Sequence, residues 1–441
     1  VGYQALDANT TASNNTGVGY QALTANTTGT LNTALGRSAL ASDTKGNNSV
    51  AIGYNTLNAQ NFTSATDVYN TAVGYAAGAA VTTGVQNTFI GGLAGDANTT
   101  ADDNVAVGYL ALSANTTGGN LTAVGKGALA ANTEADNNTG IGLRALGATT
   151  TGGDNVAVGR DALLVNTTGN TNVAVGAFAL DANVAGDRNT AIGTEALSTM
   201  NPSGNVDTLN TAIGYNAGIA VTTGVQNTFI GGSCANAVSS GNYNTVIGMG
   251  GLGNVTTGEN CIGIGNGTTV SAVNAQHQIV IGTGGVAGGG NNTVRFGDGS
   301  STLTIGLDGS DESWAAASDL RLKKDVANST VGLAFIKDLR PVTFKWNAKN
   351  AVANNLPQYD ADLSDPVFGE GKAHHGFIAQ EVKTVIDAHS DVVDGHNLWS
   401  EDPNGTQQIA PSALIPMLTK AVQELSTALD AALARIATLE G

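Results

Sequence analysis

Residues 70–92 read NTAVGYAAGAAVTTGVQNTFIGG, and almost the same stretch returns at residues 210–232. Each copy holds two versions of a shorter phrase, Asn-Thr-x-x-Gly, that begin 17 residues apart. The glycine that ends the phrase recurs at positions 2, 19, 36, 53, 74, 91, 108, 125, 142, 159, 176, 193, 214, 231, 248, 265 and 282. The spacing is 17 residues except for two steps of 21, which follow Gly53 and Gly193. Such strict self-similarity predicts a solenoid in which each repeat forms one coil.

A repeat of 17 residues is too short for two helices and their turns, so the coils are expected to be built from β-strands. Each unit carries a short β-rich run, such as Ala72-Val73 or Phe89-Ile90, bounded by Asn and Gly. The recurring glycine, called here the anchor glycine, permits a backbone conformation that a side chain would forbid, so the chain can turn a corner. With one strand spacing of about 4.8 Å per coil, the steps between the anchors predict a rod on the order of 80 Å long.

Two further features of the coil follow from the phrase. The Asn four residues before the anchor, such as Asn70 or Asn87, is expected to stack on its counterparts in a ladder of side-chain amides. In Thr-Ala-Val-Gly the adjacent apolar residues point to opposite faces of a strand, so one face is expected to fill the coil and the other to meet a neighbouring chain. The two four-residue insertions must bulge from one face, because the register resumes after each.

Composition excludes several classes of function. The 441 residues carry a net charge of −17 and only 12% charged residues, so a nucleic acid or an anionic membrane is not expected as a partner. No apolar run is long enough to cross a bilayer. The two cysteines, Cys234 and Cys261, lie in no metal-binding motif and are interpreted as buried thiols of the solenoid wall. No cofactor and no metal site is expected.

One repeat carries a resemblance to a known family. Residues 47–53 read NNSVAIG. This phrase resembles the repeat in the head domain of trimeric adhesins of the YadA type. The resemblance implies a parallel β-roll and a homotrimer around a shared axis, with a larger coil here because the repeat is longer.

The character of the sequence changes near residue 300. All three tryptophans and six of the seven prolines lie beyond this point. Three blocks then follow in order: SDLRLKKDVANSTVGLAFIKDLRPVTFKWN from residue 318, HHGFIAQEV at 374–382, and ALIPMLTKAVQELSTALDAALARIATLE at 413–440. The blocks resemble the intramolecular chaperone of endosialidase tailspikes, the S74 peptidase family.

That resemblance implies a single self-cleavage. Ser318 would be the nucleophile, Lys323 its base and Ala317–Ser318 the bond that is cut, with Asp319 orienting the loop. A serine needs such a base, and a lysine can serve if burial lowers its pKa. His374 or His375 would position the reacting peptide, and the doublet leaves the choice open. On the alternative interpretation, Ser318 and Asp319 only cap a turn, and Lys323 is a solvated surface charge.

The last block predicts a helix with two heptad series. Leu418, Leu425, Ala432 and Leu439 form one series, and Val422, Leu429 and Ile436 form the other, after a break at Pro411 and Pro416. These are the core positions of about three heptads of a coiled coil. A lone amphipathic helix that packs on its own domain would show a similar stripe.

The predicted fold is therefore mainly β: a trimeric β-solenoid of 17-residue coils, then a small α+β chaperone domain that ends in a helical coiled coil. The expected segments are a shaft (1–297), a neck that leads to the cleavage site (298–317), the chaperone (318–412) and the coiled-coil helix (413–441). The favoured function is a bacteriophage tail fibre of the virion that binds a host-surface glycan or protein and joins other tail proteins through a region before Val1. A bacterial trimeric adhesin is the alternative, and a glycan-degrading tailspike is disfavoured because the repeats offer no paired carboxylates.

Overall fold

The computed structural model describes residues 1–307, 315–316, 324–353, 359–367, 371–392, 397–401 and 406–440. The chain divides into two compact units, Val1–Ala317 and Ser318–Gly441. Each unit is described here by itself.

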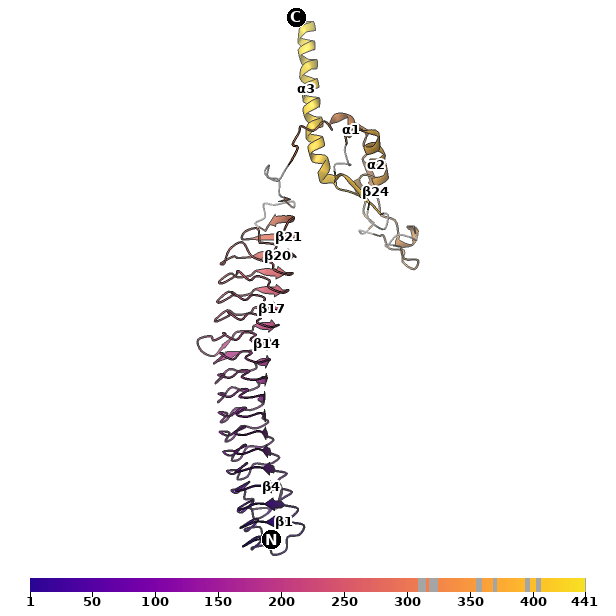
Figure 1. Cartoon of the computed structure of the whole chain (residues 1–441). Helices are drawn as coiled ribbons and strands as arrows, with labels where there is room; N and C mark the ends of the chain where they lie inside the picture. Colours follow the sequence, from indigo (N-terminus) through magenta and orange to yellow (C-terminus); the bar gives the residue numbers. More distant parts are fainter. Residues whose placement is uncertain are drawn as a thin grey trace. The chain divides into compact units, whose positions relative to one another are not determined.

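The first unit is a parallel β-solenoid with 17-residue coils, as the sequence predicts (Figure 1). Each coil contributes one short strand to a single long sheet, and each strand pairs in register with its equivalent in the next coil, for example Ala72 with Phe89. The strands are β1 (Thr16–Val18), β2 (Thr33–Leu35), β4 (Val50–Ile52), β6 (Thr71–Val73), β7 (Thr88–Ile90), β8 (Val105–Val107), β9 (Thr122–Val124), β10 (Thr139–Ile141), β11 (Val156–Val158), β12 (Val173–Val175), β14 (Thr190–Ile192), β16 (Thr211–Ile213), β17 (Thr228–Ile230), β18 (Thr245–Ile247), β19 (Ile262–Ile264) and β20 (Gln278–Gly282).

The two insertions leave the register intact, as expected. Val50 pairs with Thr71 across the first one and Thr190 with Thr211 across the second, so the extra residues leave the sheet. A protruding loop is visible beside β14 (Figure 1). Each insertion adds a two-residue parallel pair, β3 (Gly46–Asn47) with β5 (Thr66–Asp67) and β13 (Gly186–Asp187) with β15 (Val206–Asp207).

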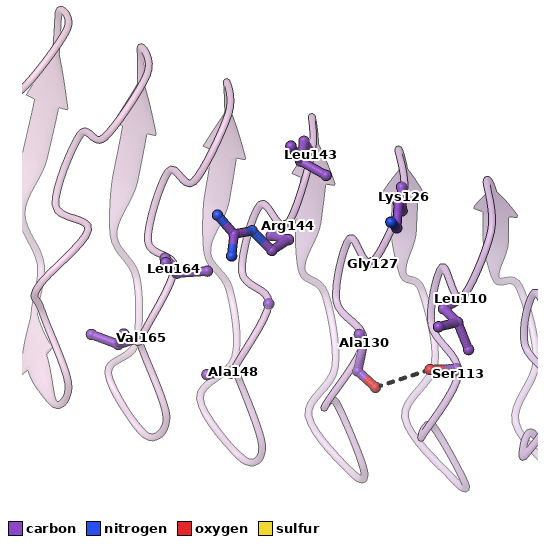
Figure 2. A pocket seen from close by; sticks show the side chains of 11 residues that line it. Leu110, Ser113, Lys126, Gly127, Ala130, Leu143, Arg144, Ala148, Leu164 and Val165 are labelled. Carbon is purple, nitrogen blue, oxygen red and sulfur yellow. Dashed lines mark hydrogen bonds between the residues drawn. The ribbon is translucent and has the colours of Figure 1, made fainter.

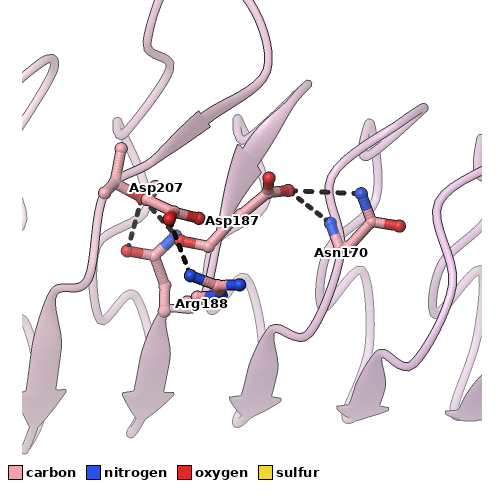
Figure 3. A network of polar contacts seen from close by, with 6 residues as sticks. Asn170, Asp187, Arg188 and Asp207 are labelled. Atoms are coloured by element: carbon pink, nitrogen blue, oxygen red, sulfur yellow. Dashed lines mark hydrogen bonds and ion pairs between the residues drawn. The ribbon is translucent and has the colours of Figure 1, made fainter.

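Polar contacts tie the second insertion to the coils beside it (Figure 3). Asp187 accepts a 2.6 Å hydrogen bond from the backbone N–H of Asn170, one coil earlier. Arg188 reaches Asp207 with a nitrogen to oxygen distance of 2.6 Å. Both side chains of this ion pair are about half exposed, so its contribution to stability is small and salt-dependent.

The core of the solenoid is thin, and its parts are matched in size. The middle residue of each strand points inward and is usually Ala, while a leucine four residues after the anchor fills the rest of the coil. Phe89 is the inward-pointing strand residue of its coil, and the leucine position of that coil is occupied by Gly95. In the preceding coil the leucine position is occupied by Gly78. A Cβ built on Gly95 would lie 2.5 Å from the Phe89 ring, and one on Gly78 would lie 2.9 Å from it. A large strand residue is therefore accommodated by removing the neighbouring leucines.

The anchor glycine is required for two independent reasons. At Gly74 the backbone angle φ is +137°, outside the regions that L-residues populate readily. A Cβ built there would also lie 2.5 Å from the carbonyl oxygen of Gly91 in the next coil. The glycine thus turns the chain, as predicted, and also lets successive coils approach closely.

The predicted asparagine ladder is present and fully buried. The backbone N–H of Asn87 donates to the side-chain oxygen of Asn70 at 2.9 Å, and its side-chain amide donates to the carbonyl of Ala101 at 2.9 Å. A second ladder, which was not predicted, lies seven residues after the anchor. In it Asn132 donates to Asn115 at 2.9 Å, and Asn115 donates to Asn98 at 2.8 Å. Hydrogen bonds between these buried amides link successive coils wherever asparagine holds the position.

The solenoid ends in a change of strand direction. β21 (Thr293–Gly297) continues the parallel sheet, whereas β22 (Thr302–Gly306) pairs with it antiparallel and β23 (Ala315–Ala316) pairs antiparallel with β22. Strands therefore occupy parts of the interval that the sequence marked only as a neck, 298–317. An antiparallel hairpin caps the sheet edge that the last coil would otherwise expose.

The second unit is small and mixes helices with short strands. Its elements are α1 (Leu333–Asp338), β24 (Val342–Phe344), the 3-10 helix η2 (Lys349–Ala351), β25 (His374–Gly376), α2 (Ala379–Ala388), β26 (Trp399–Glu401), β27 (Gln407–Ile409), the 3-10 helix η4 (Pro411–Ala413) and α3 (Leu414–Glu440). Its core includes Phe335, Val382, Leu398 and Met417.

The break expected at Pro416 does not occur. Helix α3 begins at Leu414, two residues before this proline. Proline is tolerated in the first turn of a helix because the N–H that it lacks would have no partner within the helix. Pro411 instead opens the short η4 helix.

Candidate functional site

The predicted cleavage residues and the two histidines fall in different parts of the second unit. Ala317, Ser318, Asp319 and Lys323 lie outside the described residues. Their roles therefore remain predictions from the resemblance. His374 and His375 are described, and the site can be built around them.

A short hairpin-like ladder positions the histidine doublet. Strand β25 pairs antiparallel with β24, placing His374 opposite Phe344 and His375 opposite Thr343. Because successive side chains of a strand point to opposite faces, the two imidazoles lie on opposite sides of this ladder.

His374 lies among aromatic rings. Its ring stacks on Phe344 with a centroid distance of 5.7 Å and meets Trp346 edge-on at 6.4 Å. Its Nε2 atom is buried and has no hydrogen-bond partner among the described residues. A buried imidazole nitrogen without a partner is costly, so such an atom is a candidate for a group that takes part in chemistry.

His375 has a different environment. It is exposed, and its Nδ1 atom lies 3.5 Å from the hydroxyl oxygen of Thr343, at the outer limit of a hydrogen bond. No aromatic ring holds its imidazole in the described contacts, so the doublet consists of one oriented ring and one ring with more freedom.

An ion pair joins the first and second of the three sequence blocks. Arg340, just before β24, donates from Nε to Glu381 of α2 at 2.9 Å and also from a terminal nitrogen to the other carboxylate oxygen. The hydrogen bond from Arg340 lowers the pKa of Glu381 from its ordinary value. The pair fixes the start of α2 against β24, and so it supports the ladder that carries the histidines. Both residues lie within the sequence blocks described above, but nothing in the sequence pairs them.

A third histidine was not singled out by the sequence. His389 follows α2, and its Nε2 atom lies 2.8 Å from the carboxylate of Asp338 at the end of α1. Its ring meets Phe335 edge-on at 5.4 Å. His389 lies outside the three sequence blocks, so no motif could single it out. The contacts indicate a residue that joins α1 to α2.

Helix α3 packs on the described residues of its unit through its first turns. Leu414, Met417 and Ala421 are buried, and the side chain of Glu424 accepts a 2.8 Å hydrogen bond from the backbone N–H of Leu333 at the start of α1. The heptad residues themselves are exposed from Leu418 onward, for example Val422 by 64% and Leu429 by 59%. The stripe is not used for packing within the described part of its own unit.

The described residues of the first unit form a surface groove but no comparable cluster of reactive groups. A cavity of about 590 Å³ is lined mainly by apolar residues, with Lys126 and Arg144 at its edge (Figure 2). Cys234 and Cys261 are buried, and burial raises the pKa of the Cys234 thiol to about 11. A thiol in this state is a poor nucleophile. Within the described ranges, no set of three or more His, Cys, Asp or Glu residues is arranged to hold a metal ion.

Comparisons with known proteins match one region. Residues 318–391 match the model of a family described as the chaperone of endosialidase. The matched segment begins at the residue where the second compact unit begins. No curated protein and no solved structure matches the chain significantly. No helix in the described part of the chain is long and apolar enough to cross a membrane.

Proposed function

We propose that the chain is a trimeric fibre whose C-terminal unit assembles it and then releases itself by cleavage between Ala317 and Ser318. The observation that carries the proposal is the succession of a parallel β-solenoid and an endosialidase-type chaperone region that begins at Ser318. The solenoid supplies a rod, and a parallel rod of several chains needs a device that sets their register, because its contacts are non-local and slow to form.

Unpaired apolar surface supports the trimer. The last residue of each strand points away from the coil and is usually Val or Ile, for example Ile90, Ile213 and Ile247, each about 40% exposed. These residues recur once per coil along the sheet, forming a continuous apolar stripe. A stripe of this length on a single chain indicates an interface. The exposed heptad residues of α3 form a second apolar stripe, which a coiled coil with the same helix of neighbouring chains would bury.

The proposed cleavage uses residues of this chain alone. Lys323, as a neutral amine, removes the proton of the Ser318 hydroxyl, and the oxygen attacks the carbonyl carbon of Ala317. The C–N bond then breaks as the amine of Ser318 takes up a proton. Water hydrolyses the resulting ester, leaving a carboxylate on Ala317 and a free hydroxyl on Ser318.

Of the two histidines, we assign the supporting role to His374. Its ring is oriented by Phe344 and Trp346, and its buried Nε2 atom has no partner among the described residues. His374→Ala is expected to slow cleavage strongly, and His375→Ala to slow it little. The reverse order would move the role to His375.

The test of the whole proposal compares the intact chain with Ser318→Ala. After expression, the intact chain is expected to give a product that ends at Ala317 and a C-terminal product that begins at Ser318, whereas Ser318→Ala stays whole. Intact-mass measurement distinguishes these outcomes, and sedimentation shows whether both proteins are trimers. Cleavage that persists in Ser318→Ala would refute the assigned nucleophile, and a monomeric uncleaved chain would refute the fibre.

We further infer that the fibre belongs to a bacteriophage virion, where it binds a host-surface glycan or protein and joins other tail proteins. The endosialidase-type region favours this setting over the alternative, a bacterial trimeric adhesin. Electron microscopy of virions labelled with an antibody against the shaft would test it. Labelling of bacterial cells in place of virions would favour the adhesin.

A further inference from the structure

The residue that follows each anchor glycine forms a stack along one corner of the solenoid. Tyr3 and Tyr20 stack with ring centroids 5.4 Å apart and planes 13° from parallel, and Tyr54 and Tyr75 stack with the same spacing at 10°. All four rings are substantially exposed, between 43% and 67%. The spacing of the rings is set by the rise of about 4.8 Å per coil.

Arg37 occupies the same position in the coil between Tyr20 and Tyr54. Its guanidinium carbon lies 5.6 Å from the centroid of each of these two rings. A planar cation thus fills a space between two tyrosines that are two coils apart, about 10 Å along the axis. This arrangement combines stacking with attraction between a cation and the electron-rich ring faces.

The stack is interrupted at Gly92. This glycine follows the anchor Gly91 and lies between Tyr75 and Tyr109, which are 60% and 52% exposed. Tyr75, Gly92 and Tyr109 occupy this position in three successive coils, as Tyr20, Arg37 and Tyr54 do. The two sets differ in that the middle coil of the first set has no side chain there. A Cβ built on Gly92 would lie 3.6 Å from the ring of Tyr109, which is ordinary contact, so the position is not closed to a side chain.

The same interruption recurs in the second copy of the long duplication. Gly232 follows its anchor and lies between Tyr215 and Met249, which are 59% and 63% exposed. A Cβ built on Gly232 would meet nothing within 4 Å. Lys126 and Leu143 hold the equivalent position in two intervening coils and lie along the same corner (Figure 2). The duplication thus carries two open positions on one line along the shaft.

We propose that the position at Gly92 is a binding slot for the guanidinium group of an arginine on a partner protein, and that Gly232 provides a second slot with one aromatic wall. The stack of Tyr20, Arg37 and Tyr54 shows that two tyrosines at this spacing hold a guanidinium. The net charge of −17 draws a cationic partner and disfavours an anionic one. The proposal concerns the shaft alone and does not depend on cleavage.

The test uses the full chain labelled with 3-fluorotyrosine, whose signals are assigned by single Tyr→Phe variants. Titration with N-acetylarginine amide is expected to shift the fluorine signals of Tyr75 and Tyr109. N-acetyllysine amide is expected to shift them less, because an ammonium group is not planar and is more strongly hydrated. Indole and methyl glucoside are titrated in the same way, as probes for an aromatic side chain and for a sugar.

Two variants sharpen the result. Gly92→Arg fills the slot from within and is expected to abolish the shifts of Tyr75 and Tyr109 while Tyr215 still responds. Arg37→Ala opens an equivalent slot and is expected to confer new shifts on Tyr20 and Tyr54. Circular dichroism checks that each variant is folded.

Three results would overturn the proposal. Equal shifts with the arginine and lysine amides would reduce the effect to charge alone. Larger shifts with indole or the glucoside would assign the slot to an aromatic group or a sugar. A folded Arg37→Ala variant without new shifts would show that two tyrosines at this spacing do not capture a guanidinium.

Discussion

The two units of this chain are stabilised in opposite ways. In the solenoid most coils repeat one solution, in which a buried strand residue, a buried leucine, an anchor glycine and an asparagine each contact the equivalent position one coil away. In the C-terminal unit the contacts are unique and join distant segments, as Arg340 joins Glu381 and Leu333 joins Glu424. A change in the solenoid therefore disturbs two neighbouring interfaces of the same kind. A change in the C-terminal unit removes one specific link.

The largest effect is expected from Phe89→Ala. Phe89 is fully buried, and the glycines beside it leave nothing that could fill the space of its ring. Truncation is expected to cost roughly 3–5 kcal/mol, measured by guanidinium chloride unfolding. Phe89→Ala combined with Gly95→Leu recreates the pairing of Ala106 with Leu112 and is expected to recover part of the loss. A double variant no more stable than the single one would contradict the size matching.

Two adjacent glycines provide the next comparison. Gly91 has φ of +136°, and a Cβ there would lie 2.5 Å from the carbonyl oxygen of Gly108, whereas Gly92 has room for one. Gly91→Ala is expected to destabilise the shaft by on the order of 3 kcal/mol, and Gly92→Ala by little. The midpoints of denaturant unfolding measure both variants. Equal midpoints would show that the anchor is not required.

A smaller effect is expected from the asparagine ladder. Asn155 accepts the backbone N–H of Asn172 at 2.9 Å and donates to the carbonyl of Gly169 at 2.8 Å. Asn155→Ala leaves both groups buried without these partners and is expected to cost about 2 kcal/mol. The exposed Asn201 is the matched control, and Asn201→Ala is expected to change the unfolding midpoint very little. A similar loss in both would remove the distinction between the buried ladder and the surface.

The smallest effect concerns the C-terminal unit and depends on pH. The pKa of Glu381 is lowered in the folded state by the hydrogen bond from Arg340. Its contribution to stability is therefore complete above the ordinary glutamate pKa and is lost as the pH falls through the lowered value. In Glu381→Gln this acid-dependent step is expected to disappear from thermal unfolding of the C-terminal unit. A step of the same size in both proteins would show that Glu381 does not produce it.

The sequence predicted the repeating part of the molecule better than the unique part, and the reason is physical. A contact that recurs every 17 residues leaves a period in the sequence, so the anchor glycines and the Asn70 ladder could be read directly. Other recurring features escaped because they contradict local preferences. The buried Leu57 has φ of +47°, in a region that leucine rarely enters, and only the stacked coils hold it there.

The C-terminal unit left weaker signals. The heptad residues of α3 were predicted and are exposed, as an interface would require. The link between Arg340 and Glu381 joins residues 41 positions apart and occurs once, so no period reveals it. The break expected at Pro416 was wrong because the first turn of a helix does not need the N–H that proline lacks. The proposed preference for His374 over His375 rests on its aromatic neighbours, which only the fold brings together.

Because the coils stack in register, the length of the shaft can change by whole coils. Residues 70–92 and 210–232 are offset by 140 positions, which equals seven steps of 17 and one of 21, a whole number of coils. When such a block is added or deleted, the two coils that become neighbours make the same glycine, asparagine and strand contacts as before. No new kind of interface between coils is needed. Recombination within the repeats can therefore extend or shorten the reach of the rod in increments of about 4.8 Å per coil.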